Sequence, residues 1–188
     1  MGFKLDYDKM LLLDAEDLAE GGILRAYQSV QNALTQYGVE PGQVEEFVDN
    51  NKPSYSVRCG DQEYLIYSPV LPDDEGQSWG RAAHAFFKII NDQLSKSEYR
   101  LYAINGGNDL GGMFLTRMEC EAAQKSLPRK EDWPYLPTLD PRGMASITVR
   151  SGQDKIGHLP QAYPLLAIFL CFTTVKGTGL SEGHSKTL

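Results

Sequence analysis

The residues of this 188-residue chain whose types and spacing could support chemistry gather in one short segment, Asn105 to Gly112. The segment contains four glycines and the polar pair Asn108 and Asp109 within eight residues. Two of the glycines have the spacing of a phosphate-binding loop, but Gly-Met follows where that motif requires Lys-Ser or Lys-Thr. The G-x-G-x-x-G pattern is also absent. The sequence therefore excludes both common nucleotide-binding loops.

Two interpretations of this segment remain open. Glycines permit turns with positive φ, so the segment can be no more than the wide connection of a hairpin. Alternatively, the glycines let a ligand or partner approach the backbone closely, with Asn105, Asn108 and Asp109 as polar contacts. Asp109 alone makes a poor metal site, because calcium takes about six oxygen ligands or more.

His84 is the one histidine that falls inside an expected helix. It lies at the edge of that helix's apolar stripe, where it could act as a general base in a cleft between helix 79–94 and loop 105–112, together with Asp109. The sequence identifies no group that would orient this base. No G-x-S-x-G, H-E-x-x-H or Cys-His signature occurs either. An enzyme with His84 and Asp109 is therefore the alternative hypothesis.

The three cysteines, Cys59, Cys120 and Cys171, are widely spaced and form no CxxC pair. No histidine stands at metal-ligand spacing from any of them, so we predict no metal site and no cofactor. Reduced thiols are typical of a reducing compartment. Cys59 and Cys120 are expected to be small buried apolar residues rather than nucleophiles.

Alternating helices and hairpins are expected to position these residues. Asp14 can cap a short helical piece that Gly21 and Gly22 separate from a main helix over 23–37, where apolar residues recur at steps of four and three. Strands 54–59 and 62–67 flank a Gly60-Asp61 turn, which predicts a hairpin. Ser78 can cap the next helix. Strands 99–104 and 113–116 are expected to form a second hairpin. Thr116 and Glu119 then predict a capping box for a helix that ends at about Leu127.

The C-terminal third is less regular. Four prolines and two aromatics between 127 and 141 predict an ordered loop anchored by Trp133 and Tyr135. A strand over 145–150 and an apolar segment over 163–175 follow. The longest apolar run, Tyr163 to Phe172, has about half of the roughly 20 residues that a membrane-spanning helix needs, so no membrane partner is expected. We predict an α+β fold, mainly an antiparallel sheet of hairpins with amphipathic helices packed on it. One domain is expected over 1–188, with 144–188 the least determined part and 177–188 a loose tail.

The formal net charge of −7 belongs entirely to the first 50 residues. They hold three lysine or arginine residues against ten aspartate or glutamate residues, whereas residues 51–188 hold fifteen of each sign. A negative field repels phosphate backbones and attracts cationic surfaces, so no nucleic-acid partner is predicted. Glu16, Asp17 and Glu20 are either a solvated face that aids solubility or a contact for a basic protein.

Four stretches carry a resemblance to a small bacterial family: LDAEDLAEGGI, SWGRAAHAFFKIIN, YRLYAINGGNDLGGMFLT and DWPYLPT. They span about Leu13 to Thr138. The family consists of uncharacterised bacterial proteins similar in size and charge to toxin-neutralising immunity proteins. The resemblance implies a protein that covers a toxin's active site rather than a catalyst. It assigns no functional residue, and the chain after about Gly143 falls outside it.

The sequence thus favours a protein-binding module of the immunity type, with a basic toxin as the kind of partner. Reduced cysteines and an N-terminus without the pattern of a signal peptide favour a cytoplasmic location. No oligomeric state is predicted. The expected partner contacts are Glu16, Asp17, Glu20, Asn105, Asn108 and Asp109.

Overall fold

The computed structural model describes residues 3–71, 75–139 and 145–146. The chain divides into two units, Met1–Ser151 and Gly152–Leu188, and all described residues belong to the first. The expectations for the apolar segment and the tail lie outside the described residues. A single domain for the whole chain therefore stays a prediction.

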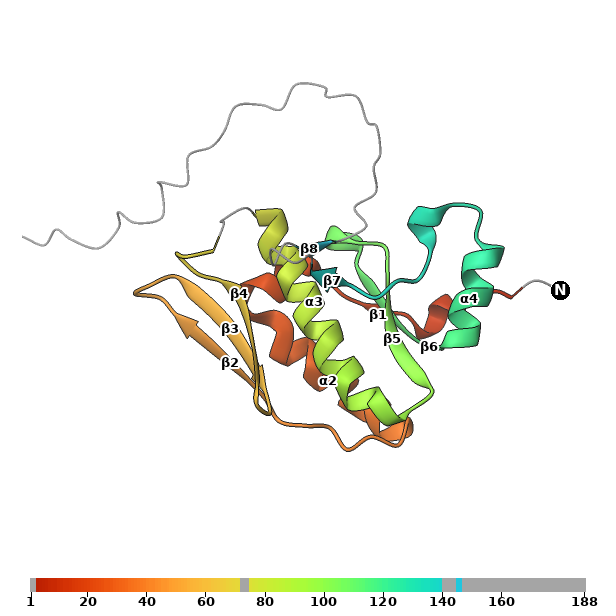
Figure 1. Cartoon of the computed structure of the whole chain (residues 1–188), viewed down its shortest axis with the longest axis horizontal. Helices are drawn as coiled ribbons and strands as arrows, with labels where there is room; N and C mark the ends of the chain where they lie inside the picture. The colour runs from red at the N-terminus through yellow and green to blue at the C-terminus, as the bar shows by residue number, and fades with distance from the viewer. Residues whose placement is uncertain (1–2, 72–74, 140–144, 147–188) are drawn as a thin grey trace, which may run out of the picture. The chain divides into compact units, whose positions relative to one another are not determined.

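Two antiparallel three-stranded sheets form the main β part of the fold (Figure 1). Sheet A has the order β1 (Leu11–Leu12), β6 (Gly111–Thr116) and β5 (Tyr99–Ile104). Sheet B has the order β2 (Val44–Asp49), β3 (Ser54–Cys59) and β4 (Gln62–Tyr67). A short sheet pairs β7 (Thr138–Leu139) with β8 (Ala145–Ser146), the described part of the strand expected over 145–150.

The main helical elements are α1 (Ala15–Asp17), the kinked turn η2 (Leu18–Gly22), α2 (Ile23–Gln36), α3 (Glu75–Gln93) and α4 (Arg117–Ser126). Short 3-10 turns are η1 (Tyr7–Lys9), η3 (Leu94–Lys96), η4 (Gly107–Asp109) and η5 (Lys130–Asp132). The predicted α+β class is confirmed, and so is the alternation of helices with hairpins. Three strands were not predicted: β1 and β2 each add a third strand to a predicted hairpin, and β7 lies in the segment that was predicted as a loop.

The acidic N-terminal region folds as two helical pieces that meet at a kink. Asp14 caps the first piece, since its Oδ1 accepts hydrogen bonds from the backbone N–H groups of Glu16 at 2.9 Å and Asp17 at 3.4 Å. Gly21 then adopts a φ of 97°, which side chains disfavour. A Cβ on Gly22 would lie 2.6 Å from the Asp17 carbonyl oxygen. The predicted cap and glycine break are both confirmed.

Beyond the kink, α2 buries the predicted stripe except Tyr37 and ends at Gln36, and Gly38, with a φ of 77°, follows its C-cap residue. The buried residues of α2 are Ile23, Tyr27, Val30 and Leu34.

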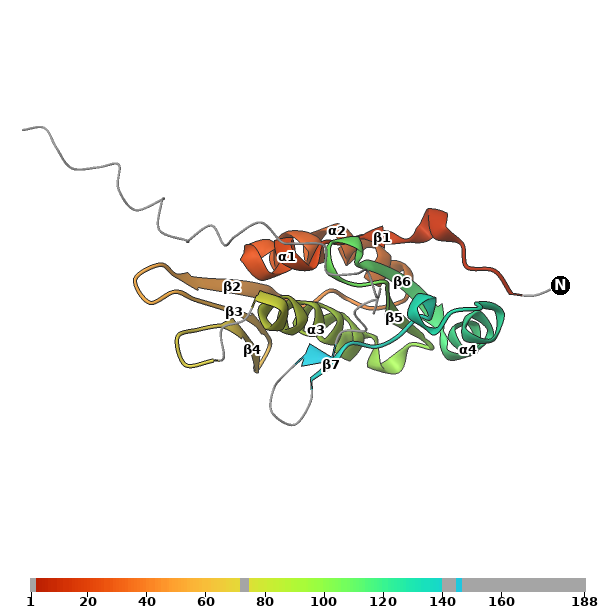
Figure 2. The same cartoon turned by 90° about the horizontal axis from the view of Figure 1, so that it is seen from above.

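Helix α3 lies between the two sheets, with α1 and α2 on one side of it (Figures 1 and 2). It begins at Glu75, so the predicted cap at Ser78 is wrong and Ser78 lies within the helix. A helix that is apolar on several sides belongs in a core, and α3 buries Ala82, Ala83, Ala85, Phe86, Phe87, Ile89 and Ile90.

The hairpin β3–β4 closes through the predicted two-residue turn, since Cys59 pairs with Gln62. Its register shifts between Tyr55 and Ser56, which leaves Ile66 on β4 as the extra residue of a bulge. The Ile66 carbonyl is not left without a donor, because the Nε of Arg81 on α3 donates a hydrogen bond to it at 2.5 Å. Arg81 is only 6% exposed, so α3 closes this part of the β4 edge.

The hairpin β5–β6 differs from the prediction at its connection. Gly111 and Gly112 were predicted as part of the loop, but both lie in β6, where Gly111 pairs with Ile104. They pair with β1 as well, and a Cβ on Gly111 would lie 2.7 Å from the Met10 Sδ. Close approach of the neighbouring chain, rather than a turn, therefore requires glycine at this position.

The outer edge of β5 is closed by two groups from distant parts of the chain. The Asn91 side-chain amide on α3 donates a hydrogen bond to the Leu101 carbonyl at 2.9 Å and accepts one from the Leu101 N–H at 2.8 Å. Two residues along β5, the backbone of Tyr135 exchanges both hydrogen bonds with Ala103, at 2.7 and 3.0 Å. The expected anchoring of the proline-rich segment by Tyr135 is thus confirmed.

The remaining predicted features of this region are confirmed too. Thr116 and Glu119 form the capping box at the start of α4. The indole Nε1 of Trp133 donates a hydrogen bond to the Leu127 carbonyl at 3.2 Å, which fixes the proline-rich segment against the end of α4.

Candidate functional site

The structure brings together the two segments that the sequence singled out for partner binding. Helix α1 and the turn η4 are in contact, although about 90 residues separate them. The Leu13 N–H donates a hydrogen bond to the Leu110 carbonyl at 2.8 Å, and the Asn108 amide reaches the Glu16 carboxylate at 3.5 Å. We call the surface formed by Glu16, Asp17, Glu20, Asn108 and Asp109 the acidic corner.

The charges of the acidic corner are only partly balanced. The carboxylate of Asp17 forms an ion pair with Arg25 of α2, and this contact raises the pKa of the guanidinium. Glu20 and Asp109 are exposed, and neither has an ion-pair partner in the described part of the chain. Glu16 has only the long contact to Asn108. The corner therefore keeps a net negative charge that faces solvent.

A groove of about 370 Å³ lies beside the acidic corner. Its apolar wall includes Leu12, which is 84% exposed, and the ion pair of Asp17 and Arg25 forms part of its polar wall. The groove therefore places one exposed apolar side chain beside the charged groups of the acidic corner. Sequence reasoning missed Leu12 and Arg25 as members of this surface. The apolar run from Met10 to Leu13 was the signal that could have indicated Leu12.

Asn105 has a structural role in the loop. Its φ of 59° is a left-handed conformation that asparagine tolerates better than most residues. Its carbonyl accepts a hydrogen bond from the Tyr135 hydroxyl at 2.8 Å. Burial raises the pKa of that tyrosine to about 12, so the hydroxyl keeps its proton and continues to donate.

His84 is half-buried, and its Nδ1 lies 3.0 Å from the Pro137 carbonyl oxygen. Because a carbonyl oxygen can only accept, Nδ1 carries the proton and the neutral ring has Nε2 as its acceptor. No hydrogen bond joins His84 to Asp109 in the described ranges. Neither residue lines the groove beside the acidic corner, or the pocket and groove along the N-terminal segment at residues 3–9. The enzyme hypothesis stays a prediction.

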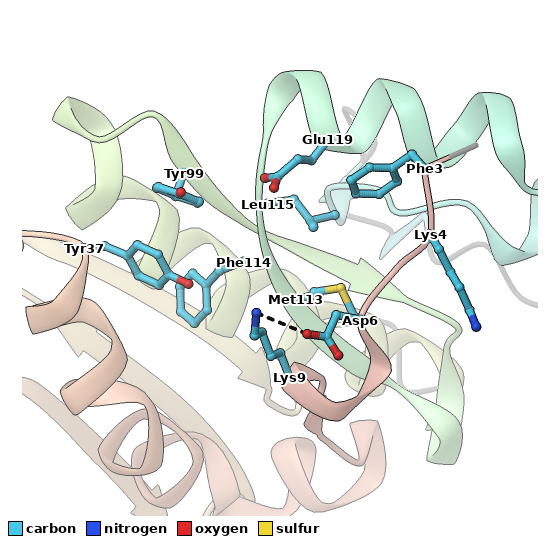
Figure 3. Close-up of a pocket in the computed structure, with 10 residues that line it drawn as sticks. All are labelled: Phe3, Lys4, Asp6, Lys9, Tyr37, Tyr99, Met113, Phe114, Leu115 and Glu119. Atoms are coloured by element: carbon cyan, nitrogen blue, oxygen red, sulfur yellow. Dashed lines mark ion pairs between the residues drawn. The ribbon is translucent and has the colours of Figure 1, made fainter. Parts of the chain in front are cut away.

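A pocket of about 260 Å³ lies where the N-terminal segment crosses sheet A (Figure 3). Tyr37 forms its aromatic side, with ring centroids 4.5 Å from Tyr99 and 4.7 Å from Phe114. Lys9 and Asp6 form an ion pair at 3.1 Å at its mouth, and a second, more open groove follows the N-terminal segment beside them. Sequence analysis did not indicate this pocket, because its residues come from four separate segments.

Two groups that line the pocket, Lys9 and Tyr37, have pKa values shifted away from neutral pH. The hydrogen bond between Lys9 and Asp6 raises the pKa of Lys9, which therefore stays cationic. Burial raises the pKa of Tyr37, which stays neutral. Neither group is moved toward neutral pH, as a general acid or base would require.

The described part of the chain contains two cysteines, Cys59 and Cys120. The thiols of Cys59 and Cys120 are free, and burial raises the pKa of each, which keeps them protonated. Within residues 3–71, 75–139 and 145–146, no three histidine, cysteine or acidic side chains are arranged to hold a metal ion. Over the same ranges, no helix has the length and apolar character needed to cross a bilayer.

Comparisons with protein-family models, curated protein sequences and solved structures gave no match to this chain.

Proposed function

We propose that this protein is a protein-binding module whose acidic corner and adjoining groove engage a partner with a basic surface. The observation that carries the proposal is the contact between α1 and η4, which joins two polar segments distant in sequence into one negatively charged surface beside the exposed Leu12. Uncompensated carboxylates attract a cationic partner and increase its rate of association.

An immunity-type role is consistent with this surface. In that role the partner is a basic toxin, which the module inhibits by covering it, and no catalytic group is needed on the module itself. The resemblance of residues 13–138 to proteins similar to immunity proteins supports this part of the proposal. We place the complex in the cytoplasm, where free thiols such as those of Cys59 and Cys120 stay reduced.

Charge reversal on the corner tests the proposal. The variant Glu16→Lys, Glu20→Lys, Asp109→Lys leaves the ion pair between Asp17 and Arg25 intact. Its matched control reverses three exposed acidic residues elsewhere and changes the net charge by the same amount: Glu40→Lys, Glu98→Lys, Glu131→Lys.

Each form of the protein would be used to capture partners from its source cells at low salt, followed by identification and by measurement of association rates with the purified partner. We expect the wild type and the control to retain a stoichiometric basic protein and the corner variant to lose it, mainly through slower association. Equal capture by all three forms, or no stoichiometric partner at low salt, would contradict the proposal.

A further inference from the structure

The edges of the two main sheets are not equally protected. On sheet A, Asn91 and Tyr135 occupy the outer edge of β5, and β1 at the opposite edge is only two residues long. On sheet B, the bulge at Ile66 and its hydrogen bond from Arg81 interrupt the edge of β4. The six-residue strand β2 is different, because nothing in the described part of the chain pairs with its outer edge.

The hairpin geometry shows which backbone groups of β2 point outward. In a two-residue hairpin the pair that flanks the turn, here Cys59 and Gln62, exchanges hydrogen bonds, so the N–H and C=O of Cys59 point toward β4. The N–H and C=O groups of successive residues point to opposite sides of a strand, so those of Arg58 point toward β2. Arg58 lies opposite Glu45, whose own N–H and C=O therefore point toward β3. The N–H and C=O groups of the alternate β2 residues therefore face the free edge. These residues are Val44, Glu46 and Val48.

Strand β2 is also straight and held in place. Its register with β3 runs without interruption from Val44 opposite Cys59 to Asp49 opposite Ser54. In its middle, the Glu46 Oε1 accepts hydrogen bonds from the Leu24 N–H at 2.8 Å and from the Tyr55 hydroxyl at 2.5 Å. The strand contains no proline, lysine or bulge, and the charges that it does carry, on Glu45, Glu46 and Asp49, are all negative, so they protect this edge against acidic strands rather than cationic ones. A fixed strand loses little entropy when another strand is added.

The side chains on the solvent face of β2 indicate the kind of strand that fits. Phe47, which is 41% exposed, lies between Glu45 and Asp49 on this face. Arg58 lies over the Phe47 ring at 4.8 Å and pairs with Glu63, so neither Glu45 nor Asp49 has a cationic partner within the described ranges. An added strand would place its own side chains directly opposite these three residues.

A second copy of the chain fits this edge poorly. Two antiparallel registers give a long overlap between the β2 strands of two copies and keep the solvent faces of both strands on the same side. In one register Glu46 lies opposite Glu46, and in the other Glu45 lies opposite Asp49. Like charges directly opposite each other destabilise a strand pair, whereas opposite charges stabilise it. Charge thus favours a cationic segment over self-association.

We propose that the free edge of β2 binds an extended segment of a partner protein by strand addition. The segment carries lysine or arginine opposite Glu45 and Asp49 and an apolar residue opposite Phe47. Main-chain hydrogen bonds to Val44, Glu46 and Val48 supply affinity, and the alternating side chains supply specificity. This inference concerns a surface outside the acidic corner and does not depend on the proposed function.

The probe is a capped peptide, Thr-Lys-Thr-Val-Thr-Lys-Thr, added to the full chain and followed by amide hydrogen exchange and by titration. We expect the peptide to slow exchange at the amides of Val44, Glu46 and Val48, while those of Glu45 and Phe47 change little because they already pair with β3. N-methylation of the two central threonine amides, which face β2, should abolish binding. N-methylation of the central valine amide, which faces away, should not.

Three protein variants test the backbone and charge contacts of the peptide on β2. Val48→Pro removes an outward N–H without removing a bond to β3, and it should weaken the peptide about fivefold, whereas Val48→Thr should not. Glu45→Lys should weaken the lysine peptide by a similar factor and favour a peptide with glutamates in place of the lysines.

Peptide binding that is insensitive to methylation of the inward amides would overturn the proposal. Protection of the Val44, Glu46 and Val48 amides that rises with protein concentration in the absence of peptide would also overturn it, because it would identify a second copy as the occupant. The corner variant Glu16→Lys, Glu20→Lys, Asp109→Lys should bind the peptide like the wild type, so failure of one proposal leaves the other standing.

Discussion

The clearest prediction concerns Asn91, whose side-chain amide takes the place of a neighbouring strand beside β5. Replacing it with alanine leaves both the N–H and the C=O of Leu101 without a partner, and Leu101 is fully buried. An unsatisfied buried backbone group costs about 1–3 kcal/mol, so the loss of both partners in Asn91→Ala should lower the free energy of unfolding by about 2–6 kcal/mol. With a denaturation slope of about 2 kcal/mol per molar urea, a loss of about 3 kcal/mol moves the midpoint down by about 1.5 M.

Urea denaturation followed by circular dichroism measures this change, and amide exchange reports on the Leu101 N–H directly. Asn32→Ala, on the exposed face of α2, is the control, and it should be neutral or slightly stabilising because alanine favours helix. Asn91→Asp keeps the acceptor for the Leu101 N–H but places a carboxylate oxygen against the Leu101 carbonyl. Its neutral form is favoured in the folded state, so its deficit should shrink as the pH falls. An Asn91→Ala midpoint within about 0.3 M of the wild type, with the Leu101 amide still protected, would refute the reasoning.

Three further predictions concern the buried titratable groups and the kink. Burial raises the pKa of Tyr135 from 10.0 to about 12. The contribution of the neutral hydroxyl to stability is therefore complete below pH 10 and is lost between pH 10 and about 12. The urea midpoint of the wild type should fall over that interval, and the midpoint of Tyr135→Phe should fall less steeply. Burial also raises the thiol pKa of Cys59 and Cys120, so both should react with a thiol reagent much more slowly in the folded than in the urea-unfolded protein, as mapped by mass spectrometry. Gly22→Ala, which places a methyl group 2.6 Å from a backbone carbonyl, should cost about 2–4 kcal/mol in urea denaturation, against about 1 kcal/mol for Gly38→Ala, where the space is open.

The elements that sequence predicted well are those whose signals are local. The turn at Gly60 and Asp61 between two alternating strands, and the capping box of Thr116 and Glu119, each specify their structure within a few residues. Strand β2 was missed because an edge strand needs only part of one face buried. Val44 is its one buried residue, and the two glutamates that follow it suggest a solvated segment instead.

The sequence indicated the polar residues of the acidic corner, but not the neighbouring Leu12 and Arg25 and not the arrangement of the surface. Charge counting indicated Glu16 and Glu20, and glycine spacing indicated the loop, yet nothing local shows that η4 lies against α1. That contact follows from the pairing of β1 with β6, and β1 is too short to leave a pattern in the sequence. Gly111 was misplaced for a similar reason, since a glycine that accommodates a distant Met10 looks the same in sequence as one that makes a turn.

The pairing of β1 with β6 also sets an order on biosynthesis. Leu11 pairs with Gly112, so the first strand of sheet A emerges from the ribosome about a hundred residues before its partner. At a synthesis rate of about 5–20 residues per second, β1 waits for about 5–20 seconds. Sheet B is continuous between residues 44 and 67 and can form during that time. The acidic corner therefore cannot form until about residue 112 has emerged, by which time all of sheet B has been synthesised.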